Sequence, residues 1–463
     1  MVSLISDQVH IDNGILTPAS EAIYPMLESD FELWDPESWT QGHPFGLYEQ
    51  MRTTAPIMWS KCSRGAANYW SVTRYEDIKQ VEQNTALFSS ARGGIGMVVP
   101  PRKHWKPEVL FRASLDTLIS MDEPHHMEMR RQQKDFFIPA YVAKLREKVS
   151  QKVESLLDDL ADNGPNVEFV ELFSNQLPLY TLCEMLGVDE EDRQQVIHWM
   201  HYLEMAGQFM TNPFRTFLRE PMFPFRFNGV VRDMFEYGAQ VMADRRANPR
   251  EDLLTVIAHS KLENEALPQE YLDGSWLLII FAGNDTTRNS LSGTIKLMTE
   301  FTDQRAMVLA DPSLIPAMSE EALRMVSPVK HMRRTLMADT ELRGQRMAKD
   351  EKVVMWYGAA NRDPDVFPNP DTFDLTRPNV GRHLAFGYGA HKCLGQRVAQ
   401  MQLQVAYEQI FARFPNIEFT GDMTYAPNVL VNAISKLRVD LYGQGNSRPG
   451  VVQVNGTANV DAA

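Results

Sequence analysis

One short stretch near the end of the chain combines a single cysteine with several glycines. Residues 386–395 read FGYGAHKCLG, so three glycines surround Cys393. Glycine allows backbone turns that other residues avoid and lets a flat group approach the backbone closely. A following helix is indicated by apolar residues at helical spacing, namely Ala399, Leu403, Ala406 and Ile410. Because a helix amino terminus favours an anion, the Cys393 thiolate is suited to bind iron on one side of a large planar ligand.

A second unusual stretch lies inside a helical pattern that spans residues 271–298. Residues 282–287 read AGNDTT, which puts a glycine, an acid and two threonines where helix propensity and core patterning disfavour them. The apolar run before it, residues 276–282, is expected to be buried on all sides. A threonine here can donate to a carbonyl one turn earlier and open the helix to water, and the adjacent acid can relay protons. The alternative is a helix end, stopped at Gly283 and capped by Asp285.

Two charged patterns add to these stretches. Glu321 and Arg324 lie three residues apart and share a helix face, although most such pairs are solvated surface contacts. His126 and Arg130 lie four residues apart on one face of a helix that follows Pro124.

These four stretches together resemble the cytochrome P450 family. Residues 386–395 match its pattern Phe-x-x-Gly-x-x-x-Cys-x-Gly at every fixed position. Residues 282–287 are similar to its Ala/Gly-Gly-x-Asp/Glu-Thr motif, and residues 321–324 to its Glu-x-x-Arg pair. The histidine–arginine stretch also resembles the family pattern, with Glu123 in place of the usual proline. All four occur in the order that the family shows.

The resemblance implies haem b, iron protoporphyrin IX, as the cofactor and Cys393 as the axial metal ligand. It implies that Asp285 and Thr286 are the catalytic pair that supplies protons for oxygen activation. The other implied cofactor-binding residues are His126, Arg130, Ala282, Gly283, Arg334, Phe386, Gly387, His391 and Gly395. Four of these are expected at the two propionates: His126, Arg130, Arg334 and His391. There, Arg334 is preferred over its neighbour Arg333.

The resemblance also gives roles to two further groups of charges. Glu321, Arg324 and Arg377 are expected to form a buried triad, in which loss of one partner is costly. A basic patch is expected from Arg130, Arg131, Lys134, Lys392 and Arg397. Such a patch would steer an acidic electron donor, although ordinary solvated charges are an equal alternative. Ferredoxin with ferredoxin reductase is the implied donor system, since the chain shows no flavin or dinucleotide fingerprint.

The expected function is insertion of one oxygen atom from O2 into a C–H bond of a hydrophobic small molecule. A finer likeness to bacterial alkane and fatty-acid terminal hydroxylases lies in residues 70–74, 284–290, 353–357 and 386–391. Related motifs occur in family members that act on terpenes and steroid side chains. Three alternatives remain: a peroxide-driven or isomerising haem-thiolate enzyme, a non-enzymatic haem sensor or ligand carrier, and a zinc or structural cysteine site. The last lacks further ligands at suitable spacing.

Substrate contacts are expected from several segments. Residues 200–225 carry four methionines and five phenylalanines, which favour an adaptable apolar surface, with ordinary helix core as an equal alternative. Residues 329–332, residues 428–431 and a loop at 90–120 are expected to complete the pocket. Lys330 and His331 are placed to meet a carboxylate or hydroxyl group.

Composition limits the possible partners and compartments. The chain has 463 residues, is 44% hydrophobic and carries a formal charge of −14 without a basic tail, which argues against nucleic acid. No apolar run is long enough to span a membrane, and the first twenty residues do not resemble a signal peptide. The three cysteines, Cys62, Cys183 and Cys393, lie far apart, which argues against a disulfide framework. We therefore expect a soluble cytoplasmic protein of the bacterial type.

The order of patterns predicts a mainly α (α+β) fold, with a large helical domain around haem and small β-sheets. Helices are predicted over residues 76–83 and over most of 125–330, with breaks near Pro165, Pro213 and Pro268. Strands are predicted over residues 68–74, after Pro328, over 352–356 and within 418–442. Residues 89–120 are expected to form a long loop, and residues 358–379 to be irregular. The predicted units are an arm at 1–40, a single catalytic domain at 41–442 and a disordered tail at 443–463.

Overall fold

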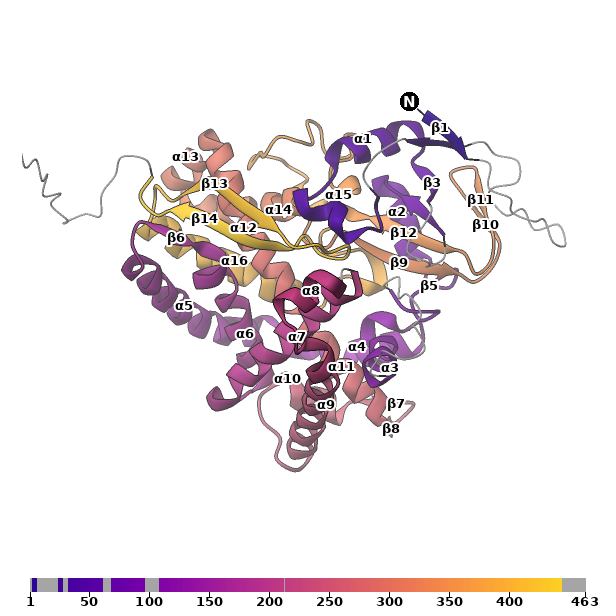
Figure 1. Ribbon diagram of the computed structural model, residues 1–463, viewed down its shortest axis with the longest axis horizontal. Coiled ribbons are helices and arrows are strands. Elements are labelled where there is room, and N and C mark those ends of the chain that lie inside the picture. The colour runs from indigo at the N-terminus through magenta and orange to yellow at the C-terminus, as the bar shows by residue number, and fades with distance from the viewer. Residues whose placement is uncertain are drawn as a thin grey trace, which may run out of the picture.

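The computed structural model describes residues 2–5, 24–27, 32–60, 68–95, 108–211 and 213–443. Helices dominate these residues, and the five-stranded and three-stranded sheets lie in the upper half of the view in Figure 1. The α-helices are α1 (Phe45–Thr54), α2 (Tyr75–Gln83), α3 (Glu108–Leu115), α4 (His125–Lys134), α5 (Pro139–Asp162), α6 (Gln176–Leu186), α7 (Arg193–Thr211), α8 (Pro213–Arg219), α9 (Phe223–Ala247), α10 (Leu253–His259), α11 (Gln269–Ala282), α12 (Asp285–Glu300), α13 (Thr302–Ala310), α14 (Ile315–Val326), α15 (Tyr357–Ala360) and α16 (Gln396–Arg413). The predicted mainly helical class is confirmed.

The strands of the described residues pair into small sheets. One five-stranded sheet has the order β3 (Ile57–Ser60), β4 (Tyr69–Val72), β12 (Lys352–Trp356), β9 (His331–Leu336) and β5 (Phe88–Ser89). Its β4–β12 pair is parallel and joins segments far apart in sequence. A three-stranded sheet has the order β13 (Glu418–Tyr425), β14 (Ile434–Asp440) and β6 (Asn166–Glu168). The two-stranded pairs are β1 (Val2–Ile5) with β2 (Tyr24–Leu27), β7 (Lys261–Leu262) with β8 (Glu265–Ala266), and β10 (Thr340–Leu342) with β11 (Gln345–Met347).

Helix α12 is largely buried although most of its side chains are polar. Its short hydroxyl groups donate to carbonyl oxygens one turn earlier, as Ser290 Oγ does to the Thr286 oxygen over 2.8 Å. This leaves few unsatisfied polar groups, so the helix can lie inside the core. The hydroxyl of Tyr407 donates to the Leu291 carbonyl and thereby ties α16, which follows the cysteine loop, to α12.

The amino-terminal region contributes to the core, which corrects the prediction of an arm over residues 1–40. The 3-10 helix η1 (Pro36–Gln41) carries Trp39, which is fully buried and stacks on Trp356 with ring centroids 5.7 Å apart. Trp34 is also buried. The acidic residues around these tryptophans led to the prediction of an exposed segment. The large apolar area of the two tryptophans instead favours their burial.

The predicted long loop over residues 89–120 is wrong for its second half, where α3 forms. This helix packs closely on α11: a Cβ on Gly274 would lie 2.2 Å from the carbonyl oxygen of Asp116, just beyond α3. The prediction rested on glycines and prolines, which end before α3 begins. Residues 96–107 of the predicted loop lie outside the described residues.

Most other predicted elements are confirmed. The predicted helix at 76–83 is α2, and the predicted strands are β4, β9, β12, β13 and β14. The prediction that residues 358–379 are irregular is wrong at its start, where α15 extends to Ala360, whereas residues 361–379 contain neither an α-helix nor a strand. Cys183 and Cys393 are free thiols, whereas Cys62 and residues 444–463 lie outside the described part of the chain. None of the helices among the described residues is long and apolar enough to cross a membrane. The division into arm, domain and tail otherwise stays a prediction.

Candidate active site

Two glycines with left-handed backbone conformations shape the cysteine loop. Gly387 has a φ of 67° and Gly389 a φ of 65°, values that residues with a side chain rarely adopt. A Cβ on Gly389 would also lie 2.6 Å from the carbonyl oxygen of Glu82 on α2. The Cys393 amide donates to the Phe386 carbonyl oxygen over 2.8 Å and closes the loop. The helix predicted to follow is α16, which begins at Gln396.

The Cys393 side chain is exposed and lies before the amino end of α16. Desolvation by the surrounding protein is the largest influence and raises the pKa of its thiol. The backbone amides of Gly395 and Gln396, with the charges of Arg130 and Lys392, act in the opposite direction. The loop therefore offers amide donors that partly offset the effect of the surrounding protein on the thiol. A metal cation completes such a site, because coordination keeps the thiol deprotonated.

The side chains predicted to bind propionates cluster beside the loop. The rings of His126 on α4 and His391 have centroids 3.9 Å apart. Burial, followed by the charges of Arg130 and Arg334, lowers the pKa of His126 to about 4. Burial and Arg334 are the main causes that lower the pKa of His391 to about 2. Among the described residues, the Nδ1 atoms of both rings are buried without a hydrogen-bond partner. Two guanidinium groups and two unsatisfied imidazoles suit carboxylate groups.

Two arginines connect this cluster to its scaffold. Arg130 on α4 donates through Nη2 to the Lys392 carbonyl oxygen, which holds α4 against the cysteine loop. Arg334 on β9 is buried, and its Nη2 lies 3.8 Å from Glu82 Oε1. Arg333 instead donates through Nε to the Gly94 carbonyl oxygen over 3.1 Å. Adjacent strand residues point to opposite faces, so only Arg334 joins the histidines.

Glu82 is a buried carboxylate that sequence reasoning missed. It accepts a hydrogen bond of 2.6 Å from the Tyr357 hydroxyl and lies near Arg334. Burial is the largest effect and raises the pKa of Glu82 to about 7. Its position at the end of α2 gave no signal in the sequence, because an acid near a helix end is ordinarily solvated.

The predicted continuous helix around the threonine motif is interrupted. α11 ends at Ala282 and α12 begins at Asp285, while Gly283 and Asn284 keep right-handed backbone angles. Thr286 Oγ1 donates to the Ala282 carbonyl oxygen over 3.2 Å, as predicted for a threonine that distorts a helix. Of the alternative, the helix end at Gly283 is observed, since Gly283 is the C-cap of α11, whereas a cap by Asp285 is not: Asn284 occupies the cap position of α12 and makes no side-chain capping bond.

The apolar run before this motif is not buried on all sides, contrary to the prediction. Phe281 is 42% exposed, and Ala282 is exposed as well. A cavity of about 410 Å³ lies beside them. Its apolar lining comes from α7, α11 and the loop between β13 and β14, and includes Met200, Phe281 and Leu430. The run therefore forms a wall, with one face packed in the core and the other open to the cavity.

Polar groups of the same cavity form a charged cluster that sequence reasoning missed. Asp285 Oδ1 lies 3.3 Å from Arg288 Nη2, and Glu204 Oε2 on α7 lies 3.9 Å from Arg288 Nη1. Asn284 donates through Nδ2 to Asn175 Oδ1 over 3.3 Å. The spacing of Asp285 and Arg288 on one helix was legible in the sequence, but Glu204 gave no signal of its own.

The predicted charge triad is present. Arg324 donates through Nε and Nη2 to the two carboxylate oxygens of Glu321, each over 2.7 Å, and Arg377 donates to Glu321 Oε1 over 3.1 Å. Glu321 and Arg324 are fully buried. Further donations from Arg324 go to the carbonyl oxygens of Asn361 and Pro370. The triad joins α14 to the irregular segment that leads into the cysteine loop.

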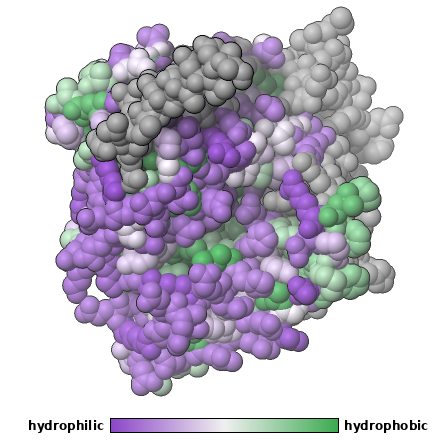
Figure 2. Space-filling view, turned by 60° about the vertical axis from the view of Figure 1, so that its left-hand side comes forward, coloured by the Kyte–Doolittle hydropathy of each residue, from purple (hydrophilic) through white to green (hydrophobic). Residues whose placement is uncertain are grey.

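The predicted substrate segments divide into three kinds. Met205 and Phe223 belong to the core, whereas Met200 lines the cavity of about 410 Å³ together with residues 428–430. A third group consists of large exposed side chains on α8 and the start of α9: Phe214, Phe217, Leu218, Met222 and Phe225. Figure 2 shows a face on which hydrophobic patches interrupt a mainly hydrophilic surface.

Lys330 and His331 both have hydrogen bonds to backbone carbonyl oxygens, and their predicted contact with a substrate group stays a prediction. Lys330 donates to the Asn428 carbonyl oxygen over 2.6 Å and lies over the ring of Trp39. His331 shares a 3.1 Å hydrogen bond between Nδ1 and the Val429 carbonyl oxygen. Both side chains hold the 428–430 loop against β9, because buried polar groups take backbone partners.

The threonine motif and the cysteine loop are related through the helices that follow them. α12 carries Asp285 and Thr286, α16 follows Cys393, and the Tyr407–Leu291 hydrogen bond fixes one helix to the other. Similarly, α4 and β9 bring His126 and Arg334 to His391.

Comparison with known proteins agrees with this geometry. The sequence model of the family described as Cytochrome P450 matches residues 306–424. The linalool 8-monooxygenase of Pseudomonas putida is 32% identical over 415 residues, which cover 89% of this chain and 98% of that protein. The methyl-branched lipid omega-hydroxylase of Mycobacterium tuberculosis is 29% identical, with 89% and 94% covered. The structure of the Mycobacterium marinum cytochrome P450 CYP268A2 in complex with pseudoionone superposes with a TM-score of 0.78 at 30% identity, covering 91% of this chain and all of that one.

These similarities extend over nearly the whole length of the relatives, and the chain belongs to the cytochrome P450 family. It is therefore an oxidoreductase of the monooxygenase type, and its cofactor is haem.

Proposed function

We propose that this protein hydroxylates an unactivated C–H bond of a hydrophobic molecule with a long or branched apolar chain. The observation that carries the proposal is the cavity of about 410 Å³, whose apolar wall of α7, α11 and the 428–430 loop meets Asp285 at the helix break. Its size lies within the range of small-molecule sites, roughly 300–1,000 Å³. The names of the relatives support the substrate class, since they concern linalool, a methyl-branched lipid and pseudoionone.

The residues beside the cysteine loop fit the two chemical demands of haem. The Cys393 sulfur, with the amides of Gly395 and Gln396 beside it, would supply a thiolate ligand to the iron. His126, Arg130, Arg334 and His391 supply cationic and unsatisfied polar groups for the two propionates. Phe386, Gly387 and Gly395 would border haem at the cysteine loop, and Ala282 and Gly283 would border it at the helix break, where a Cβ on Gly283 would lie 3.0 Å from Leu182 Cδ1 on α6. Haem so bound supplies the oxidising chemistry, since a thiolate ligand favours O–O cleavage.

The chain's own residues position the substrate and manage protons. The apolar cavity wall excludes water from the chain of the substrate and directs it toward the helix break. Thr286 Oγ1 donates to the Ala282 carbonyl oxygen, and Asp285 is held by Arg288. We assign Thr286 to placing a proton donor at the break and Asp285 to replenishing that proton.

Electrons come from a separate donor, for which we propose ferredoxin with its reductase. Arg131, Lys134, Lys392 and Arg397 are exposed on or beside α4 and the cysteine loop, in a chain whose formal charge is −14. Arg130 joins these two elements through its bond to the Lys392 carbonyl oxygen. A local basic surface of this kind attracts an acidic protein. The expected cytoplasmic location stays a prediction.

A visible-spectrum titration of the purified ferric holoprotein tests the substrate class. The ligands are linalool, a methyl-branched fatty acid, an unbranched alkane and a steroid. A shift of the haem toward high spin with at least one of them is expected, and the absence of any shift contradicts the proposed class.

A pair of cysteine variants tests the axial ligand. Cys393→Ser is expected to lose the thiolate signature of the reduced carbon monoxide complex, whereas Cys183→Ser, which changes the buried free cysteine of α6, keeps it. A retained signature in Cys393→Ser contradicts the assignment.

A further inference from the structure

One buried guanidinium on α12 lies between carboxylates from two helices. Arg288 is 7% exposed and has Asp285 one turn before it and Glu204 of α7 opposite, at 3.3 and 3.9 Å. The contact connects α7 to the residue that we assign to proton delivery.

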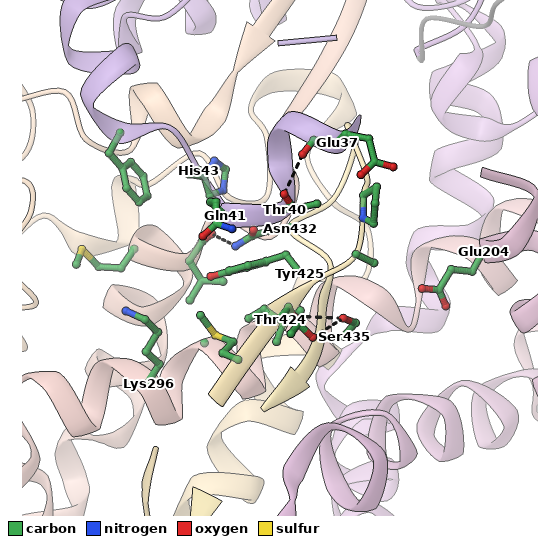
Figure 3. A pocket seen from close by; sticks show the side chains of 18 of the residues that line it. Glu37, Thr40, Gln41, His43, Glu204, Lys296, Thr424, Tyr425, Asn432 and Ser435 are labelled. Atoms are coloured by element: carbon green, nitrogen blue, oxygen red, sulfur yellow. Dashed lines mark hydrogen bonds between the residues drawn. The ribbon is translucent and has the colours of Figure 1, made fainter. Parts of the chain in front are cut away.

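Glu204 also lies where two cavities adjoin. A larger cavity of about 860 Å³ and the smaller cavity of about 410 Å³ share only Glu204, Ala426 and Pro427 in their linings. Of these three, Glu204 alone has an ionisable side chain. Figure 3 shows the larger cavity, with Glu204 and Lys296 on opposite sides of it.

The two cavities differ in polarity. The larger one has polar groups on every side, among them Glu37, Gln41, Lys296, Thr424, Asn432 and Ser435 (Figure 3). The Asn432 Oδ1 atom is buried and lacks a hydrogen-bond partner among the described residues. A roomy cavity with several polar partners holds water. The smaller cavity is largely apolar, so Glu204 separates a space suited to water from one suited to an apolar substrate.

Two polar groups beside Glu204 are unsatisfied in the part of the chain that the structure describes. Arg288 Nε and Asn284 Oδ1 are buried and have no hydrogen-bond partner. Both residues are more than nine-tenths buried and line the smaller cavity. Buried groups of this kind are normally satisfied by water or by a polar ligand. Arg288 Nε and Asn284 Oδ1 therefore offer a donor and an acceptor to a bound water molecule.

The charges around Glu204 favour its protonated form. Burial is the largest effect and raises the pKa of Glu204; Asp285 raises it further, while Arg288 and His201 lower it. The other charged groups on the cavity walls are Glu37, Arg219, Lys296 and Arg362. Two carboxylates beside one guanidinium leave one negative charge in excess at this cluster.

We propose that Glu204 is a positioning residue for proton delivery, which passes protons from water in the larger cavity to Asp285. The Glu204 carboxyl loses a proton to water bound at Arg288, that water protonates Asp285, and water of the larger cavity restores the proton on Glu204. No oxidant or reductant takes part in this relay. The proposal rests on the proposed function, because monooxygenation consumes two protons for each oxygen atom that leaves as water.

Infrared spectroscopy of the holoprotein tests the relay without turnover. A protonated-carboxyl band that titrates above the range of an ordinary glutamate is expected in the unmodified protein. The part of this band that Glu204 contributes is expected to be missing in Glu204→Gln, which keeps the shape of the side chain but cannot exchange the proton. The part that Glu82 contributes, whose pKa is also raised, stays. Glu191→Gln changes an exposed acid just before α7 and should leave the band intact. A spectrum that Glu204→Gln does not alter overturns the proposal, even if the substrate class is wrong.

Turnover with ferredoxin supplies the second measurement. Glu204→Gln is expected to lower product formation roughly tenfold, to shift its pH profile and to increase its solvent isotope effect. Glu204→Asp should restore part of the rate, and the ligand-induced spectral shift should stay unchanged. An unchanged rate and pH profile overturn the relay. A lost spectral shift with normal coupling also overturns it, because Glu204 would then act on substrate entry.

Discussion

Two buried arginines of this protein have opposite surroundings. Arg324 donates to both oxygens of Glu321 and to backbone carbonyl oxygens, so its guanidinium is saturated with partners. Arg288 lies between two carboxylates at 3.3 and 3.9 Å, and its Nε has no hydrogen-bond partner among the described residues. The first belongs to the scaffold of the cysteine side and the second to the cavity on the threonine side. A saturated network serves rigidity, whereas an unsatisfied one is available for water and protons.

The largest effect is expected from removing the saturated arginine. Arg324→Ala leaves Glu321 buried with only Arg377 as a charged partner, which should lower the free energy of unfolding by about 3–5 kcal/mol. Urea denaturation measures the loss. Arg413→Ala, which breaks an exposed pair with Asp158, is the control and should cost less than about 1 kcal/mol. If Arg288→Ala destabilises as much as Arg324→Ala, the contrast between the two sides is wrong.

A second substitution tests how tightly α11, the helix before the threonine motif, packs against α3. An alanine Cβ at position 274 would meet the Asp116 carbonyl oxygen at 2.2 Å, so Gly274→Ala should destabilise the protein by roughly 1–3 kcal/mol. Gly229→Ala on α9 has open space around its Cβ and should instead stabilise by up to about 1 kcal/mol. Thermal unfolding of the two variants compares them. Equal shifts for both would show that the α3–α11 contact is loose.

pH should distinguish the neutral buried histidines from the charged networks. Burial is the main cause that lowers the pKa of His331 to about 3, below its unfolded value of 6.5. Between these two pKa values the unfolded chain binds a proton at this histidine that the folded chain does not bind. The free energy of unfolding is therefore highest above pH 6.5 and decreases as the pH falls from 6.5 toward 3. The slope is at most about 1.4 kcal/mol per pH unit for one histidine. His331→Asn should flatten the dependence between pH 6.5 and 5 in urea titrations, and an unchanged slope would contradict this account.

The smallest effect on stability is expected at the helix break, where the effect on function is large. Thr286→Ala removes one hydrogen bond to the Ala282 carbonyl oxygen and should change the unfolding free energy by about 1 kcal/mol or less. Peroxide formed per reductant consumed should rise several-fold, because a proton donor is lost at the break. Thr287→Ala, at the buried neighbour, is the matched control for coupling. Coupling that stays normal in Thr286→Ala removes the assigned role.

Local motifs made much of the site predictable. The glycines at 387 and 389, the cysteine and the helix after it are neighbours in sequence, so their spacing already implied the loop that forms. Glu321 and Arg324 lie three residues apart on one helix, so their contact was predictable from the sequence, and the fold added their burial. These predictions succeeded because short-range geometry decides them.

Long-range packing decided the features that sequence reasoning missed. Glu82 is buried because the cysteine loop, some 300 residues later in the chain, covers it. Trp39 is buried because β12 presents Trp356 to it. In both cases the partner lies far away in the chain, where no pattern of spacing connects the two.

The amino-acid sequence by itself determined the family, the turns of the cysteine loop and the mainly helical class, since each depends on residues a few positions apart. The tertiary structure alone decided that Glu204 of α7 faces Arg288 of α12 at the junction of two cavities. It also decided that Lys330 and His331 have hydrogen bonds to the backbone carbonyl oxygens of Asn428 and Val429. The physical reason is the same throughout: the burial and partners of a polar side chain depend on elements that the fold brings together from distant parts of the chain.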